Sequence, residues 1–232
     1  MMTIKAATEI AGTLGNPSKM PGRSYGLPAG GATWVAQCAV DDGRDVPPTF
    51  GCAIGGILAR LKGTTCFKCY ALDRGNYRYG SVRVAQMRRA CGIFSADWVP
   101  AMVRLITARV DPEDPYFRWH DAGDLQGLWH LEKIVLVAIL TPWVKHWIPS
   151  RELAVVLEWT AKNGEFPDNL AVRVSAIKVD GPPTNKVALT STVNSETKAP
   201  GWQCPAPLQG NACGPCRACW DNTVENVGYP LH

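Results

Sequence analysis

The chain has 232 residues, of which 46% are hydrophobic, so one large domain or two small ones can bury a sizeable core without crosslinks. A formal net charge of +4, from 24 basic and 20 acidic residues, does not indicate a nucleic-acid-binding protein. No stretch reaches the roughly 18 apolar residues that a membrane span requires. The first residues also lack the apolar run of a signal peptide, so we expect a cytoplasmic protein.

Nine cysteines are present, an odd number, and several lie at Cys-x2-Cys spacing, which is typical of metal ligands. In a reducing cytoplasm such thiols are available to metals and do not form stable disulfides. Basic residues also gather between Arg74 and Arg89. We interpret them as a solvated helix face; a surface that faces phosphate is the alternative.

The first half of the chain is expected to be irregular and then helical. Residues 1–50 are rich in glycine, proline and serine, so we expect a segment that wraps across the opening of the main domain. Cys38 lies in an apolar run there and is interpreted as a buried small hydrophobic residue. A short helix is expected at 54–62, before the turn that carries Cys66. Two longer helices are predicted between 81 and 110.

From residue 116 onward, short apolar segments alternate with helical patterns. Strands are predicted at 116–121, 144–149, 170–176, 187–193 and 201–204, with helices at 128–140 and 153–163. Repeated strand–helix units imply parallel strands with right-handed crossovers. We therefore predict an α/β fold, a partial or full parallel (β/α) barrel, over residues 51–203. Residues 204–232 are predicted to form a cysteine-rich metal-binding tail packed on the barrel.

Polar side chains follow three of the predicted strands, at the ends where parallel α/β proteins form their sites. The candidate catalytic residues are His120, Asp124, Arg151, Glu152 and Arg173. A mouth lined by a histidine, carboxylates and guanidinium groups would suit a small-molecule or nucleotide substrate. The alternative is that the charged residues form structural ion pairs and that the histidine is a hydrogen-bonded core residue.

Cys91, at helical spacing, is interpreted as a core residue, and the other seven cysteines form two groups at opposite ends of the chain. They are Cys52, Cys66 and Cys69 in one group, and Cys204, Cys213, Cys216 and Cys219 in the other. We predict that the two groups meet at the barrel mouth and hold one or two [4Fe–4S] clusters, because Cys-x2-Cys-x2-Cys is the run that bacterial ferredoxins use. Structural zinc is the alternative, since four thiolates can close a tetrahedral site.

Six segments carry a resemblance to a known family. They are Lys19-Met-Pro-Gly, Cys66-x2-Cys69-Tyr-Ala, Arg118-Trp-His-Asp-Ala-Gly-Asp-Leu, Ile148-Pro-Ser-Arg-Glu, Val172-Arg-Val-Ser and Cys213-x2-Cys216-x2-Cys219-Trp. From about residue 16 to 221, the chain resembles the bacteriophage "gene product 88" family. The resemblance implies a phage or prophage origin and expression in bacterial cytoplasm, and it implies little about activity.

A second similarity is to the radical S-adenosylmethionine enzymes, which have a partial parallel barrel and cluster cysteines after the first strand. Cys66-x2-Cys69-Tyr occupies a comparable place, and Ala122-Gly-Asp-Leu resembles their Gly-Gly-Glu element. This resemblance implies S-adenosylmethionine as a further cofactor, with cofactor-binding residues Gly123, Asp124 and Ser175. The chain departs from the family at Lys62, where those enzymes have a cysteine, so Cys52 or a C-terminal cysteine would have to supply the third ligand.

Two functions from different classes follow from these patterns. The first is an iron–sulfur enzyme that performs redox, radical or sulfur-transfer chemistry on a small molecule or nucleotide. The second is a binding module, stabilised by zinc or iron–sulfur, that acts on a host factor without turnover. Neither pattern indicates an oligomeric state.

Overall fold

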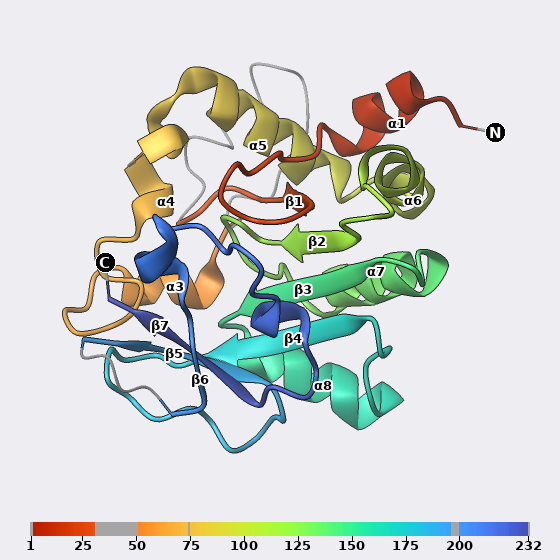
Figure 1. The fold of residues 1–232 in the computed structure, drawn as a ribbon. Coiled ribbons are helices and arrows are strands. Elements are labelled where there is room, and N and C mark those ends of the chain that lie inside the picture. The colour runs from red at the N-terminus through yellow and green to blue at the C-terminus, as the bar shows by residue number, and fades with distance from the viewer. Residues whose placement is uncertain (1, 31–50, 74, 196–199, 232) are drawn as a thin grey trace.

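The computed structural model describes residues 2–30, 51–73, 75–195 and 200–231 (Figure 1). Its centre is a seven-stranded sheet in the order β1-β2-β3-β4-β5-β7-β6, and all neighbouring strands are parallel. The strands are β1 (Arg23–Tyr25), β2 (Tyr116–Trp119), β3 (Lys145–Ser150), β4 (Leu170–Ser175), β5 (Thr190–Asn194), β6 (Trp202–Gln203) and β7 (Asn226–Pro230).

Helices connect the strands and flank the sheet. The longer ones are α1 (Ile4–Ala11), α5 (Gly80–Gly92), α6 (Trp98–Arg109), α7 (Leu128–Leu140) and α8 (Leu153–Asn163). The shorter ones are α3 (Ala53–Leu58), α4 (Tyr70–Asp73), η1 (Gly75–Arg78), η2 (Ala206–Gln209) and η3 (Ala218–Trp220). In the part of the chain that the structure describes, no helix is long and apolar enough to cross a membrane.

One face of the sheet packs against α6, α7 and α8 and forms the hydrophobic core. Leu131 and Ile134 of α7 share one buried cluster with Phe117 of β2 and Ile148 of β3. Buried apolar residues recur along α7 at three- and four-residue intervals, which is the spacing of a helix that buries one stripe. This packing fixes the strands and therefore the positions of the loops that follow them.

The opposite face of the sheet is covered by the C-terminal tail, drawn in blue in Figure 1. Trp220 of η3 makes edge contacts with Tyr116 of β2, at 5.3 Å between ring centroids, and with Trp147 of β3, at 5.1 Å. Its Nε1–H also donates to the carbonyl of Phe117 at 3.0 Å. The tail is therefore part of the folded core and is not a separate appendage.

The predicted parallel α/β fold is confirmed, and the predicted barrel is not. Each edge strand, β1 and β6, has one partner strand, so the sheet of the described residues is open. The predicted helices 128–140 and 153–163 have the bounds of α7 and α8. The sheet also takes β1 from the segment 1–50 and β7 from the tail 204–232, both of which were expected to lie outside it. Cys38 lies outside the described residues.

Candidate functional site

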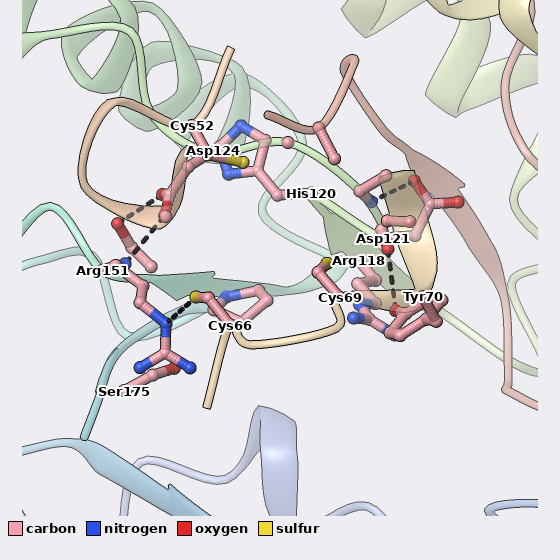
Figure 2. A pocket seen from close by; sticks show the side chains of 17 residues that line it. Cys52, Cys66, Cys69, Tyr70, Arg118, His120, Asp121, Asp124, Arg151 and Ser175 are labelled. Carbon is pink, nitrogen blue, oxygen red and sulfur yellow. Dashed lines mark hydrogen bonds between the residues drawn. The ribbon is translucent and has the colours of Figure 1, made fainter. Parts of the chain in front are cut away.

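A cavity of about 160 Å³ opens at the carboxyl ends of β2, β3 and β4 (Figure 2). Three cysteines, two arginines, two aspartates and one histidine line it. The cysteines come from the segment around α3 and α4, whereas the other groups follow the strands. Loops converge at this edge of a parallel sheet, which is where the sequence placed a site.

Three thiols surround the cavity (Figure 2). Cys52 stands directly before α3, and Cys66 and Cys69 lie on the turn before α4. The Sγ atoms of Cys52 and Cys66 each lie 3.7 Å from the point that a Cβ on Gly55 would occupy. A glycine at this position therefore leaves room between the two sulfurs. All three cysteines are free thiols.

The three thiols differ in their surroundings. Burial raises the pKa of Cys52 and of Cys69, so both are neutral at pH 7 when no metal is bound. Cys66 instead accepts a hydrogen bond from Nε of Arg151 at 3.0 Å. The same guanidinium donates to the carbonyl of Ala176 after β4. Arg151 thus holds a positive charge against one sulfur of the site.

Asp124 is a buried carboxyl group on the cavity wall. It accepts hydrogen bonds from Oγ of Ser150 at 2.6 Å, and from the backbone N–H groups of Leu125 and Arg151 at 2.8 Å each. Burial raises the pKa of Asp124 to about 6, although these hydrogen bonds oppose the rise. A carboxyl group that titrates near pH 6 can release or take up a proton close to neutral pH.

His120 lies at the end of β2 and is only 3% exposed. Its backbone N–H donates to the carbonyl of Tyr25 at 2.8 Å, and its φ of 53° turns the chain sharply after the strand. Neither ring nitrogen has a hydrogen-bond partner among the described residues. Burial, followed by the charge of Arg118, lowers the pKa of His120 to about 3. The imidazole is therefore neutral and offers one donor and one acceptor.

Asp121 also lines the cavity, so His120 and Asp121, which are adjacent in sequence, both reach the same site. Its carboxylate accepts from Oγ of Ser24 at 2.9 Å and from the backbone N–H of Ala122 at 3.0 Å. In a regular strand one of the two would face away, because adjacent strand residues point to opposite faces. The strand ends at Trp119, and this turn removes the alternation.

All three predicted cofactor residues, Gly123, Asp124 and Ser175, line the cavity, and Glu152 lies beside it. Ser175 contributes its hydroxyl, which is 2.9 Å from a serine hydroxyl on β5. Gly123 has a φ of +79°, and a Cβ there would lie 2.6 Å from Cβ of Leu27, so the backbone requires glycine. Glu152 accepts a hydrogen bond of 3.0 Å from the N–H of Ile54, at the start of α3. It therefore supports the segment that begins with Cys52.

Arg173 lies outside the cavity, buried beneath the tail. Its guanidinium donates to the carbonyls of Ala218, Cys219, Asp221 and Val224 at 2.6–3.0 Å. Four carbonyls on one side chain fix the path of the tail across the sheet. The structure thus places this predicted catalytic residue as an anchor of the tail.

The four C-terminal cysteines form a second group, and none of them lines the cavity. Burial raises the pKa of Cys213, and the neighbouring Cys204 and Cys216 raise it further. Burial likewise raises the pKa of Cys219 to about 12, although its 3.0 Å hydrogen bond with Oη of Tyr229 opposes this. Three of the predicted metal cysteines therefore surround the cavity and four gather in the tail, and a shared site for both groups stays a prediction.

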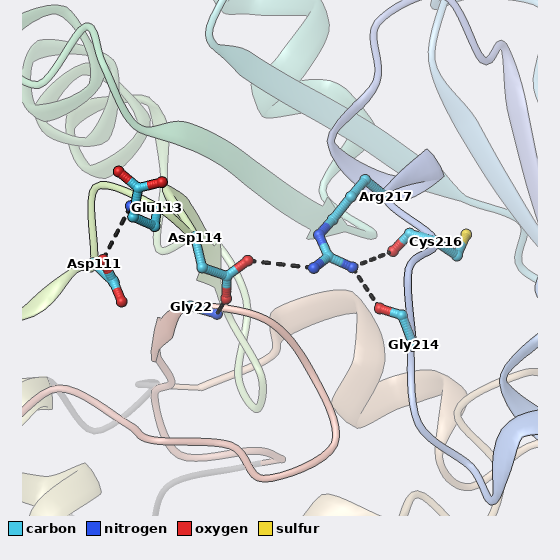
Figure 3. A network of polar contacts seen from close by, with 7 residues as sticks. All are labelled: Gly22, Asp111, Glu113, Asp114, Gly214, Cys216 and Arg217. Carbon is cyan, nitrogen blue, oxygen red and sulfur yellow. Dashed lines mark hydrogen bonds and ion pairs between the residues drawn. The ribbon is translucent and has the colours of Figure 1, made fainter.

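A polar network ties the tail to the N-terminal segment (Figure 3). Arg217 pairs with Asp114 at 3.3 Å, and the same carboxylate accepts from the backbone N–H of Gly22 at 2.9 Å. Near the second thiol group, the N–H of Cys213 donates to the carbonyl of Lys19 at 2.8 Å. The tail is thereby fixed on two sides, by the sheet and by the residues before β1.

Arg118 lies between the two thiol groups and was not selected from the sequence. Its side chain leaves β2, lines the cavity and stacks on Trp147 at 4.7 Å. Burial raises the pKa of Cys213 and of Cys219, and the charge of Arg118 opposes the rise in both. The signal that could have found it is the alternation within the strand, which places residue 118 on the face opposite the buried Phe117 and Trp119.

Comparison with known proteins identifies one family. A family model described as "Gene product 88" matches residues 3–222. No curated protein and no solved structure matches the chain, and the similarity to radical S-adenosylmethionine enzymes finds no support in these comparisons. Because the match spans nearly all of the 232 residues, the chain belongs to the gene product 88 family.

Proposed function

We propose that this protein is an iron–sulfur enzyme with two cluster sites, one in the cavity and one in the tail. Cys52, Cys66 and Cys69 would hold the first cluster, and the four C-terminal cysteines the second. The observation that carries the proposal is that three free thiols from two segments of the chain surround one cavity at the carboxyl edge of a parallel sheet. Soft thiolate ligands without a disulfide suit iron–sulfur clusters.

The donor set fits a cluster better than a single metal ion. Within residues 2–30, 51–73, 75–195 and 200–231, no three His, Cys, Asp or Glu side chains are arranged to hold one ion. The thiolates of a [4Fe–4S] cube bind different irons, so they need not converge on one point. The space that Gly55 leaves between Cys52 and Cys66 agrees with ligands that are set apart.

A cluster bound by three thiolates would supply an electron and one iron without a protein ligand. Around it, Arg151 would donate a hydrogen bond to the sulfur of Cys66, and Asp124 would offer a buried carboxyl group for proton exchange. This combination favours redox, radical or sulfur-transfer chemistry. A volume of about 160 Å³ lies below the roughly 300 Å³ at which typical ligand pockets begin, so we favour a small molecule over a nucleotide.

Anaerobic reconstitution with iron and sulfide tests the proposal. We expect a brown protein with about eight irons and eight sulfides per chain, since each cube contains about four of each. Replacing Cys66 and Cys69 together by serine should lower the iron content to about four per chain. Replacing Cys213 and Cys216 together should have the same effect, because the two sites share no ligand.

The matched control is Cys91→Ser, because Cys91 packs against the hydrophobic core from α5 and belongs to neither group. Its iron content should equal that of the unaltered protein. A protein that takes up no iron, or that keeps all of it in both double variants, would contradict the proposal.

The second candidate is a binding module in which the tail cysteines hold a structural zinc ion. The observation in its favour is that Arg173 and Trp220 fasten the tail to the sheet, as a metal-stabilised cap would require. One zinc per chain, lost on replacing Cys213 but unaffected by replacing Cys66, would favour this candidate over the enzyme.

A further inference from the structure

We infer that the cavity binds the carboxylate group of a small organic acid, and that Arg118 and His120 recognise it. This names the substrate class of the proposed enzyme and rests on the proposed function for its catalytic meaning. The recognition itself depends only on side chains of the cavity.

Arg118 is a cation whose charge Asp121 offsets in part, without forming an ion pair with it among the described residues. Its Nε is buried and has no hydrogen-bond partner there, and neither of the ion pairs in the described chain includes it. Its other contacts are weak: a 3.6 Å contact to Sδ of Met20 and the stacking on Trp147. A guanidinium carries five N–H donors in a planar fork that matches a carboxylate.

His120 supplies a second group without a partner, since both ring nitrogens are buried and unbonded among the described residues. Leaving a buried polar atom unpaired is unfavourable, so such an atom in a cavity wall points to a ligand. The neutral ring can donate one N–H to a carboxylate oxygen. Arg118 and His120 both line the cavity, and the charge of Arg118 adds to burial in lowering the pKa of His120.

The protein's own acids at the cavity are already hydrogen-bonded. Asp124 accepts from Ser150 and two backbone N–H groups, and Asp121 accepts from Ser24 and one. Neither forms an ion pair with Arg118 in the described chain. The positive charge at this wall is therefore available to an anion from outside.

A carboxylate fits this wall better than a phosphate. Phosphate groups are usually held by several backbone N–H groups at the start of a helix. Here α3 is short, and the N–H of Ile54 near its start is already bound by Glu152 at 3.0 Å. One guanidinium and one imidazole N–H provide the small number of donors that a carboxylate accepts.

The test measures the binding of acetate, acetamide and inorganic phosphate to the full-length chain, both metal-free and anaerobically reconstituted. We expect acetate to bind both forms and to shift the imidazole ¹⁵N resonances of His120 in the metal-free form. Acetamide has the same shape without the charge and should bind at least about tenfold more weakly, as should phosphate. Arg118→Gln should weaken acetate binding by at least about tenfold.

Two further variants keep the test decisive. Arg118→Lys retains the charge but not the fork, so its loss of acetate affinity should be smaller than that of Arg118→Gln, and it covers the case in which the glutamine variant does not fold. Arg217→Gln, in the tail, should bind acetate like the unaltered chain. Absence of acetate binding, equal binding by Arg118→Gln, or tighter binding of phosphate overturns the inference. If the chain takes up no iron but binds acetate as expected, the carboxylate site is supported and only the iron–sulfur function is rejected.

Discussion

Arg173→Met is expected to lower the free energy of unfolding by about 4 kcal/mol and to release the tail to proteolysis. The residue is fully buried and donates to four carbonyls of residues 218–224. Methionine has a similar length but no donor, so these four buried or partly buried carbonyls would each lose a hydrogen bond from a charged group, at about 1 kcal/mol each. Urea unfolding and limited proteolysis near η3 measure the two effects.

The matched control is Arg217→Met, an arginine on the same tail whose side chain is 30% exposed. It pairs with Asp114 near the surface, where an ion pair contributes about 1 kcal/mol or less. Equal losses of stability in the two variants would contradict the view that Arg173 anchors the tail. A large loss for Arg173→Met alone would show that the second thiol group depends on this one side chain for its position.

Among the predicted elements, the helices 128–140 and 153–163 agree with the structure at both ends, and each is a long helix that buries one stripe. The bounds of α7 and α8 follow from apolar spacing, which a sequence displays directly. In contrast, β1 has three residues, and β7 contains Asn226, Gly228 and Pro230, which are rare in strands. Pairing with β5 on one side and β6 on the other makes β7 a strand, and such long-range pairing leaves no local signal.

The candidate site likewise contains residues that the sequence could place and residues that it could not. The residues after β2 and β3 could be placed because parallel strands end at one edge, whatever the exact packing. The roles of Arg118 and Arg173 depend on what covers the sheet face from which they project. The sequence does not reveal that the tail crosses this face. It also does not reveal whether the two cysteine groups merge, because their separation is set by the path of the same tail.

Acid sensitivity should arise from three buried histidines. His120, His130 and His146 are each at most 3% exposed. Burial lowers the pKa of His120 and of His146 to about 3, and that of His130 well below 6.5. The unfolded chain takes up these protons near pH 6.5, whereas the folded chain does not, so stability falls as the pH drops below 6.5. The raised pKa of Asp124 acts in the opposite direction between about pH 4 and 6, because there the folded state binds the extra proton.

Each buried histidine contributes a slope of up to about 1.4 kcal/mol per pH unit, so three histidines less one aspartate give about 3 kcal/mol per pH unit near pH 5. His146→Gln should reduce that slope by about 1.4 kcal/mol per pH unit, because the residue no longer titrates. A glutamine can accept from Nε1 of Trp119 and donate to Oγ1 of Thr141, as His146 does at 3.3 and 2.9 Å, so stability near pH 8 should change little. Urea unfolding between about pH 5 and 8, with both proteins in the same metal state, measures the difference. An unchanged slope in the variant would show that His146 is protonated in the folded state, and its contacts with Trp119 and Thr141 would then have to differ from those described.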